Sequence, residues 1–169
     1  MKLRTSAFFV VAVAVLCFGF AVVTSLPAAQ PDRVSFAGVN TAPAVLAPGK
    51  ATQVTLRFVI VPGFHINSNT PKSDLLIPTT LKIDSANGIS AKGIAYDEGK
   101  DVAFPFDPDN KLNVYSGEFS VKTTLFVPAG TPAGTASVHG ELRYQACSDR
   151  SCFPPKTLPV DFSVTVKGR

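Results

Sequence analysis

The sequence has few of the side chains that metal and hydrolytic sites use. Its 169 residues include three cysteines and two histidines, His65 and His139. The histidines show no mutual ligand spacing, and His139 faces outward on an expected strand near neither downstream cysteine, so a Cys2His2 metal site is only an alternative. No Ser-His-Asp order or supported carboxylate pair stands out, which leaves a hydrolase without support. We expect no metal, no cofactor and no small-molecule substrate.

Long runs of one charge are also missing. The chain has 16 basic and 12 acidic side chains, a formal charge of +4. Lys2 and Arg4 lie in the expected leader, which contains no acid, so the remainder carries +2. Its basic residues are scattered and form no run that could follow a phosphate backbone. Nucleic acid is therefore not an expected partner.

The first residues have the features of an export signal. Two basic residues precede an uninterrupted apolar run at residues 7–23, and small or turn-forming residues follow at 24–29. We predict a signal peptide at residues 1–29. The apolar run of 17 residues is at the lower limit for crossing a bilayer. An uncleaved membrane anchor at residues 7–23 is therefore the alternative.

Cys17 lies inside this apolar run, directly after Leu16. A lipoprotein cysteine needs a small residue before it, so we assign Cys17 to the signal. The rest of the chain, residues 30–169, has the length of one ordinary domain with a real core. It contains only Cys147 and Cys152, an even number in a compartment that permits disulfides.

The hydrophobic period after the leader is two almost everywhere. In residues 53–61, Val54, Leu56, Phe58 and Ile60 share one face, and polar residues lie between them. Such alternation is typical of a strand with one wet face. The same pattern predicts strands at 118–127, 137–146 and 160–167, and weaker patterns predict them at 34–37, 80–83 and 93–96.

Prolines and turn signals separate the expected strands. The chain has 14 prolines, and no convincing helical period follows the leader, which argues against helices. Turn signals lie at 47–49, 61–63, 86–88, 107–110 and 128–134. About seven short strands at this spacing predict an all-β fold, an immunoglobulin-like antiparallel β-sandwich. Another all-β barrel is the alternative.

Cys147 and Cys152 are expected at the corner between two neighbouring strands. Such a corner can bring two Cα atoms within the roughly 4.4–6.8 Å of an ordinary disulfide. The bridge would be a weak staple, since its short loop gives about 2 kcal/mol and a loop of about 65 residues over 4 kcal/mol. The spacing alone leaves a structural disulfide and a redox centre equally open.

Charged neighbours would modulate the two thiols. Arg143, Arg150 and Lys156 favour a thiolate, whereas Asp149 opposes it. No helix N-terminus is expected here, so strong acidification is not expected. Such a thiol pair can still relay electrons when a docked partner supplies the activated sulfur.

Three stretches resemble a known family. They are the cysteine segment Tyr144-Gln145-Ala146-Cys147 with Cys152-Phe153-Pro154-Pro155, the segment Gly63-Phe64-His65-Ile66-Asn67-Ser68-Asn69-Thr70-Pro71, and the segment Val114-Tyr115-Ser116-Gly117-Glu118-Phe119. They are similar to the N-terminal periplasmic domain of the thiol–disulfide reductase DsbD. The resemblance implies an immunoglobulin-like fold and a periplasmic location. It also implies electron transfer from a thioredoxin-like domain to disulfide isomerases and cytochrome c maturation proteins.

The resemblance also implies roles for single residues. Cys152 would form the mixed disulfide with thioredoxin-fold partners, and Cys147 would resolve it. The family shields its cysteines with a cap loop that bears an aromatic, here expected within residues 97–113, with Phe104 or Phe106 as the lid. Ordinary core packing is the alternative for both rings.

Further residues are placed at the site by the same resemblance. His65, Asn67 and Tyr144 would line it. Asp97 and Glu98 resemble acids near the family's site, although a solvated turn explains them better.

The chain departs from the family in two ways. It has four residues between the cysteines, one fewer than the best-known member. It shows no electron-conducting membrane domain and no thioredoxin-like domain, so we expect a separate membrane electron donor. The expected function is a thiol–disulfide exchange module. The alternative is a non-redox binding or scaffold domain that uses the bridge as a staple.

Overall fold

The regular elements in the described part of the chain are all β-strands. The computed structural model describes residues 31–39, 44–85 and 88–168, among which no helix occurs. No segment of these residues is thus a helix long and apolar enough to cross a membrane. The predicted signal peptide or anchor at residues 1–29, with Cys17, lies outside the described residues. The strands are β1 (Val34–Val39), β2 (Ala44–Leu46), β3 (Ala51–Ile60), β4 (His65–Asn67), β5 (Thr80–Ile83), β6 (Ser90–Tyr96), β7 (Lys100–Phe104), β8 (Asp107–Tyr115), β9 (Glu118–Phe126), β10 (Gly134–Val138), β11 (Gly140–Tyr144), β12 (Ala146–Cys147), β13 (Lys156–Pro159) and β14 (Phe162–Val166).

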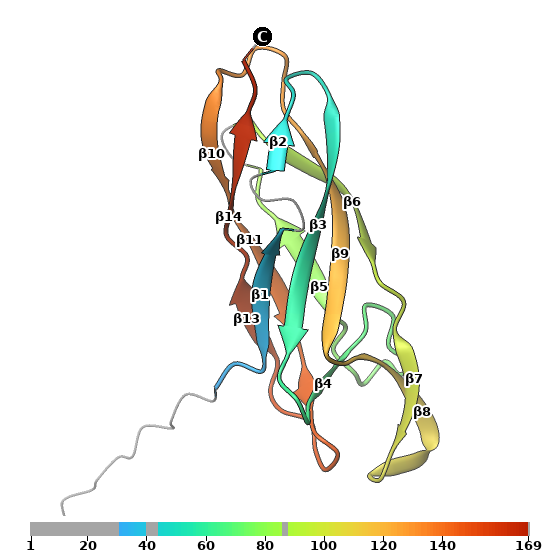
Figure 1. Cartoon of the computed structure of the whole chain (residues 1–169). Coiled ribbons are helices and arrows are strands. Elements are labelled where there is room, and N and C mark those ends of the chain that lie inside the picture. The colour runs from blue at the N-terminus through green and yellow to red at the C-terminus, as the bar shows by residue number, and fades with distance from the viewer. Residues whose placement is uncertain (1–30, 40–43, 86–87, 169) are drawn as a thin grey trace, which may run out of the picture. The chain divides into compact units, whose positions relative to one another are not determined.

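The strands form four small sheets (Figure 1). Their strand orders are β1-β3-β9-β6, β10-β14-β2, β13-β11-β5 and β12-β4-β8-β7. Neighbouring strands run antiparallel, except that β2 and β14 are parallel. The last sheet contains Cys147 in β12 and is completed by β7 and β8, which project together at one end of the fold in Figure 1.

The core fills the space between the β1-β3-β9-β6 sheet and the two three-stranded sheets. One cluster joins Leu56 and Phe58 of β3 to Leu142 and Tyr144 of β11. The other joins β3 and β9 to β2, β10 and β14. Inward residues of β3 and β9 alternate with exposed ones, as the period of two requires. The predicted all-β, immunoglobulin-like sandwich is confirmed.

The prediction of one strand at residues 137–146 was wrong. The chain there forms β10, β11 and β12, which pair with different partners: β14, then β5 and β13, then β4. The first change of sheet occurs at Gly140, where β11 begins. Glycine fits this position because a Cβ there would lie 2.5 Å from the carbonyl oxygen of Lys82. A strand that changes partners keeps its alternation, so the pattern alone does not reveal the breaks.

The turn expected at residues 107–110 lies inside β8. The hairpin between β7 and β8 turns at Pro105 and Phe106 instead. The register between the strands is irregular here, because Phe104 pairs with Asp107 but Val102 pairs with Leu112. Irregular pairing of this kind tolerates a proline, which cannot donate to the ladder.

Candidate functional site

Cys147 and Cys152 form a disulfide with an S–S distance of 2.01 Å. They lie directly opposite each other as an antiparallel bridge, so their Cα atoms are only 3.9 Å apart, closer than we expected. The two sulfurs lie in different surroundings. Cys147 ends β12 and is fully buried, whereas Cys152 is exposed on the returning segment. An incoming group from solvent can therefore approach Cys152 and not Cys147.

Backbone hydrogen bonds close the cysteine loop on both sides of the disulfide. Inside it, the N–H of Ser148 donates to the carbonyl of Ser151 at 2.9 Å. Outside it, the N–H of Phe153 donates to the carbonyl of Ala146 at 2.8 Å. The two arms of the loop therefore have bonds of their own that do not depend on the S–S bond.

The side chain of Gln145 connects these arms to the rest of the sheet. Its Nε2 donates to the carbonyl of Phe153 at 3.2 Å, and its Oε1 accepts from Asn67 Nδ2 at 3.1 Å and from the N–H of Ile77 at 3.2 Å. Asn67, predicted at the site, is fully buried in β4. Gln145 is not among the predicted site residues. The signal for it was its polarity between the buried residues Tyr144 and Ala146.

His65 lies beside Cys147. The two residues are cross-strand partners in β4 and β12, so their side chains project from the same face of the sheet. The His65 side chain is buried, and burial lowers its pKa to about 4, which leaves the imidazole neutral at pH 7. His65 therefore places a neutral ring, and not a cation, next to the disulfide.

The predicted cap segment, residues 97–113, is a β-hairpin formed by β7 and β8. Strand β8 pairs with β4 through Ile66 and Asn67. The hairpin brings the Phe104 ring onto His65, with ring centroids 3.9 Å apart and planes 20° apart. Phe106 stacks on the Phe104 ring at 5.5 Å and is itself exposed. Phe104 thus covers a neighbour of Cys147, and a capping role stays a prediction for both rings.

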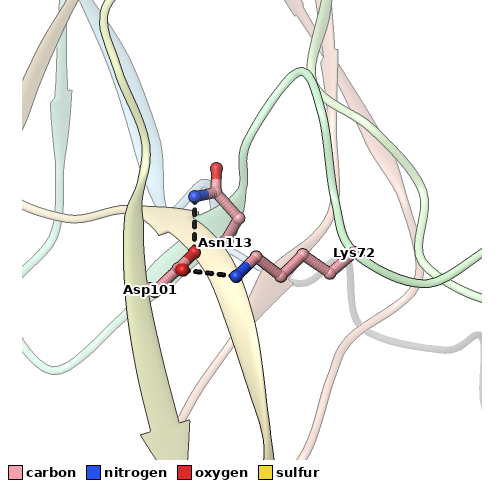
Figure 2. Close-up of polar contacts among 3 residues, drawn as sticks. All are labelled: Lys72, Asp101 and Asn113. Carbon is pink, nitrogen blue, oxygen red and sulfur yellow. Dashed lines mark hydrogen bonds and ion pairs between the residues drawn. The ribbon is translucent and has the colours of Figure 1, made fainter.

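Polar contacts fasten this hairpin at its base (Figure 2). The carboxylate of Asp101 on β7 pairs with Lys72 and accepts a hydrogen bond of 2.8 Å from Asn113 Nδ2 on β8. The Asn113 hydrogen bond, with Lys72, lowers the pKa of Asp101. Gly99 allows the close approach, since a Cβ there would lie 2.1 Å from Asn113 Oδ1. The hairpin is therefore tied to the neighbouring loop of Lys72.

Tyr144 is a core residue of β11, 1% exposed, and burial raises the pKa of its hydroxyl. Asp97 accepts a hydrogen bond of 2.7 Å from the N–H of Ser120, and its carbonyl accepts one of 3.0 Å from the Tyr115 hydroxyl. Glu98 is exposed in the same turn. These contacts agree with the turn interpretation of the two acids, and their place at a redox site stays a prediction.

Arg33 is a further residue at the site that the sequence did not indicate. Its guanidinium lies 3.9 Å from the ring centroid of Phe153 and 4.9 Å from that of Phe64. Phe153 follows Cys152 directly, so this cation packs on the residue next to the exposed cysteine. Lys156 pairs with Asp32 at 2.9 Å. Arg33 is remote from the cysteines in sequence, which gave no signal for this contact.

The metal alternative has no assembled ligand set in the described residues. No group of three histidine, cysteine or acidic side chains there could hold an ion. Both downstream cysteines are in the disulfide. The Nδ1 atom of His139, beyond the other end of β11, lies 2.7 Å from Asp161 Oδ1.

The chain is similar to several known structures. The N-terminal domain of DsbD from Neisseria meningitidis, in the reduced form, is 20% identical over 66% of this chain and 80% of that chain, with a TM-score of 0.43. A structure of the complex between the DsbD and PilB N-terminal domains from the same organism is 19% identical over 64% of this chain and 73% of that chain, with a TM-score of 0.41. The N-terminal periplasmic domain of ScsB from Proteus mirabilis is 14% identical over 70% of this chain and 42% of that chain, with a TM-score of 0.42.

Comparison with curated protein sequences finds no match. The family described as thiol:disulfide interchange protein DsbD, N-terminal, matches residues 33–163. This match spans more than half of the chain and includes both cysteines. The chain belongs to the DsbD N-terminal domain family.

Proposed function

We propose that this chain is a periplasmic thiol–disulfide exchange module that passes electrons through Cys147 and Cys152. The observation that carries the proposal is the unequal exposure of the two disulfide-bonded residues, the buried Cys147 and the exposed Cys152. An exchange reaction needs one sulfur that a partner can attack and one that stays within the protein. Membership in a family of thiol–disulfide interchange proteins supports the same chemistry.

In the proposed reduction, a thiolate of a thioredoxin-fold partner attacks Sγ of Cys152. A mixed disulfide forms, and the electron pair of the broken S–S bond goes to Cys147, which leaves as a thiolate. The thiolate of the partner's second cysteine then attacks the sulfur of the partner's first cysteine in the mixed disulfide, and Cys152 leaves as a thiolate. The partner ends as a disulfide and the module as a dithiol, so two electrons have moved. In the reverse direction Cys147 resolves the mixed disulfide.

The arrangement disfavours the alternative in which the disulfide only staples a scaffold domain. A disulfide stabilises mainly by restricting the unfolded chain, and a short loop restricts it little. Hydrogen bonds of Ser148 and Phe153 already join the arms of this loop. The bridge therefore adds little to the stability of the fold.

The module needs other proteins at both ends of the reaction. By family resemblance, we assign the electron supply to a membrane donor and the delivery to thioredoxin-fold proteins of the periplasm.

The reduction potential tests the proposal directly. We expect the folded protein, equilibrated with glutathione, to show a potential above about −300 mV, since structural disulfides lie below that value. A reduced thioredoxin-fold protein should speed the equilibration. A bridge that glutathione reduces only after the domain unfolds would overturn the proposal and leave the staple alternative.

The cap hypothesis predicts an effect on rate. Phe104→Ala removes the ring that stacks on His65 and, on the cap hypothesis, widens the approach to the disulfide. We expect reduction by dithiothreitol to become several-fold faster, because the rate of exchange depends on access. Phe126→Ala is the matched control, since Phe126 is an exposed phenylalanine of β9. Equal rates for the two variants would show that Phe104 is not a lid.

A further inference from the structure

His65 carries a buried polar atom that the fold leaves unsatisfied. Its side chain is 4% exposed, and its Nε2 has no hydrogen-bond partner among residues 31–39, 44–85 and 88–168. Buried polar atoms in native proteins are nearly always paired, so an exception needs a physical explanation. The oxidised protein therefore holds an unused hydrogen-bonding group in its interior.

The position of this group relates it to the disulfide. His65 lies directly opposite Cys147, and side chains of such a pair share one face with Cβ atoms about 4.5–5.5 Å apart. Phe104 stacks on the face of the imidazole. A ring nitrogen forms its hydrogen bonds in the plane of the ring, so this stacking fixes the ring but does not satisfy Nε2.

The protonation and hydrogen bonding of the Cys147 sulfur change when the disulfide opens. In the disulfide it carries no proton. After a partner dithiol has delivered two electrons, Cys147 is first a thiolate and then, with one proton from solvent, a thiol. Because Cys147 is fully buried, the charged form is disfavoured there, and the thiol has a weak S–H donor that a close acceptor would satisfy.

We propose that Nε2 of His65 accepts a hydrogen bond from the Cys147 thiol in the reduced protein and so stabilises the reduced form. This inference rests on the proposed function. The neutral state of the buried imidazole at pH 7 agrees with a role as acceptor. The orphaned nitrogen of the oxidised state is then the group that the reduced state uses.

Two substitutions test this assignment in the whole chain of residues 1–169. His65→Phe keeps a ring that can stack on Phe104 but has no nitrogen, and His65→Gln keeps an acceptor oxygen. For His65→Phe we expect the equilibrium with glutathione to shift toward the disulfide by roughly 3- to 10-fold, the effect of one lost hydrogen bond. A tenfold shift corresponds to about 30 mV. His65→Gln should restore most of the difference.

An unchanged equilibrium in His65→Phe, or equal shifts in both variants, would overturn the inference. A purely structural role would lower the stability of oxidised and reduced protein alike and leave the potential unmoved. Failure of the proposed function looks different, because the unsubstituted protein itself would then resist reduction while folded.

A measurement without substitutions covers the case in which the variants do not fold. Nitrogen NMR of the histidine side chains can compare the oxidised and reduced protein. We expect the Nε2 resonance of His65 to shift on reduction and that of the exposed His139, paired with Asp161, to stay in place. A His65 resonance that is the same in both states would overturn the inference.

Discussion

Cys152→Ser is expected to abolish the mixed disulfide with a thioredoxin-fold partner, whereas Cys147→Ser should trap it. The reason is the unequal exposure of the two residues, since Cys147 is fully buried and Cys152 is exposed. Without Cys147 no internal thiolate can resolve the intermediate, which then accumulates. Each variant is incubated with a thioredoxin-fold partner that has a single cysteine, activated as a mixed disulfide with thionitrobenzoate. The thiolate of the variant attacks the partner's sulfur and thionitrobenzoate leaves, and non-reducing electrophoresis reports the complex. Most of the Cys147→Ser protein should be trapped and none of the Cys152→Ser protein.

Folding must be equal for this comparison to count, so circular dichroism of both variants is the control. The double variant with both serines should form no complex at all. Trapping of Cys152→Ser in place of Cys147→Ser would reverse the assigned roles. Equal trapping of both would mean that Cys147 becomes accessible in solution and that burial does not select the attacked sulfur.

The unfolding free energy of the oxidised protein should fall by about 2 to 3 kcal/mol between pH 7 and pH 4 because of His65. Burial lowers the pKa of His65 from 6.5 to about 4. As the pH falls through 6.5, His65 becomes protonated in the unfolded chain but stays neutral in the folded protein. The free energy of unfolding therefore decreases until the pH reaches about 4. Denaturant titrations across this range measure the effect.

The His65→Phe variant should lose this part of the pH dependence, and His139→Gln, at an exposed position, should keep it. Asp101 contributes in a separate window. Its pKa is lowered from an ordinary value of 3.8, so the stability it provides is lost only at still lower pH. If the stability profile of His65→Phe superimposes on that of the unsubstituted protein between pH 7 and pH 4, the assignment of His65 as a buried neutral histidine is wrong.

The sequence predicted most of the sandwich because its central strands alternate cleanly. The expected strands at 53–61, 118–127 and 160–167 correspond to β3, β9 and β14, and 80–83 is β5. These strands have one buried face, and the period of two follows directly from that arrangement. Cys147 and Cys152, expected together at one corner of the fold, form a disulfide there.

The parts that escaped prediction depend on contacts between distant segments. Strands β2 and β4 have three residues each, too few to show a period. Strand β7 is mostly exposed, so it has no apolar face to read. Arg33 reaches Phe153 across the fold, and Gln145 meets Asn67 only because β12 and β4 pair. No local pattern in a single sequence encodes such pairings.

The hydrogen bonds around the cysteine loop bear on how partners recognise this module. Gln145 lies on one arm and donates a side-chain hydrogen bond to the carbonyl of Phe153 on the other arm. The backbone bonds of Ser148 and Phe153 also hold the arms at a fixed separation. We therefore expect that breaking the S–S bond needs little backbone reorganisation and that the surface around Cys152 keeps its shape in both redox states. On the proposed function, we expect the donor and the acceptor to dock on the same surface. The direction of transfer is left to their relative potentials, and a change of shape need not select between them.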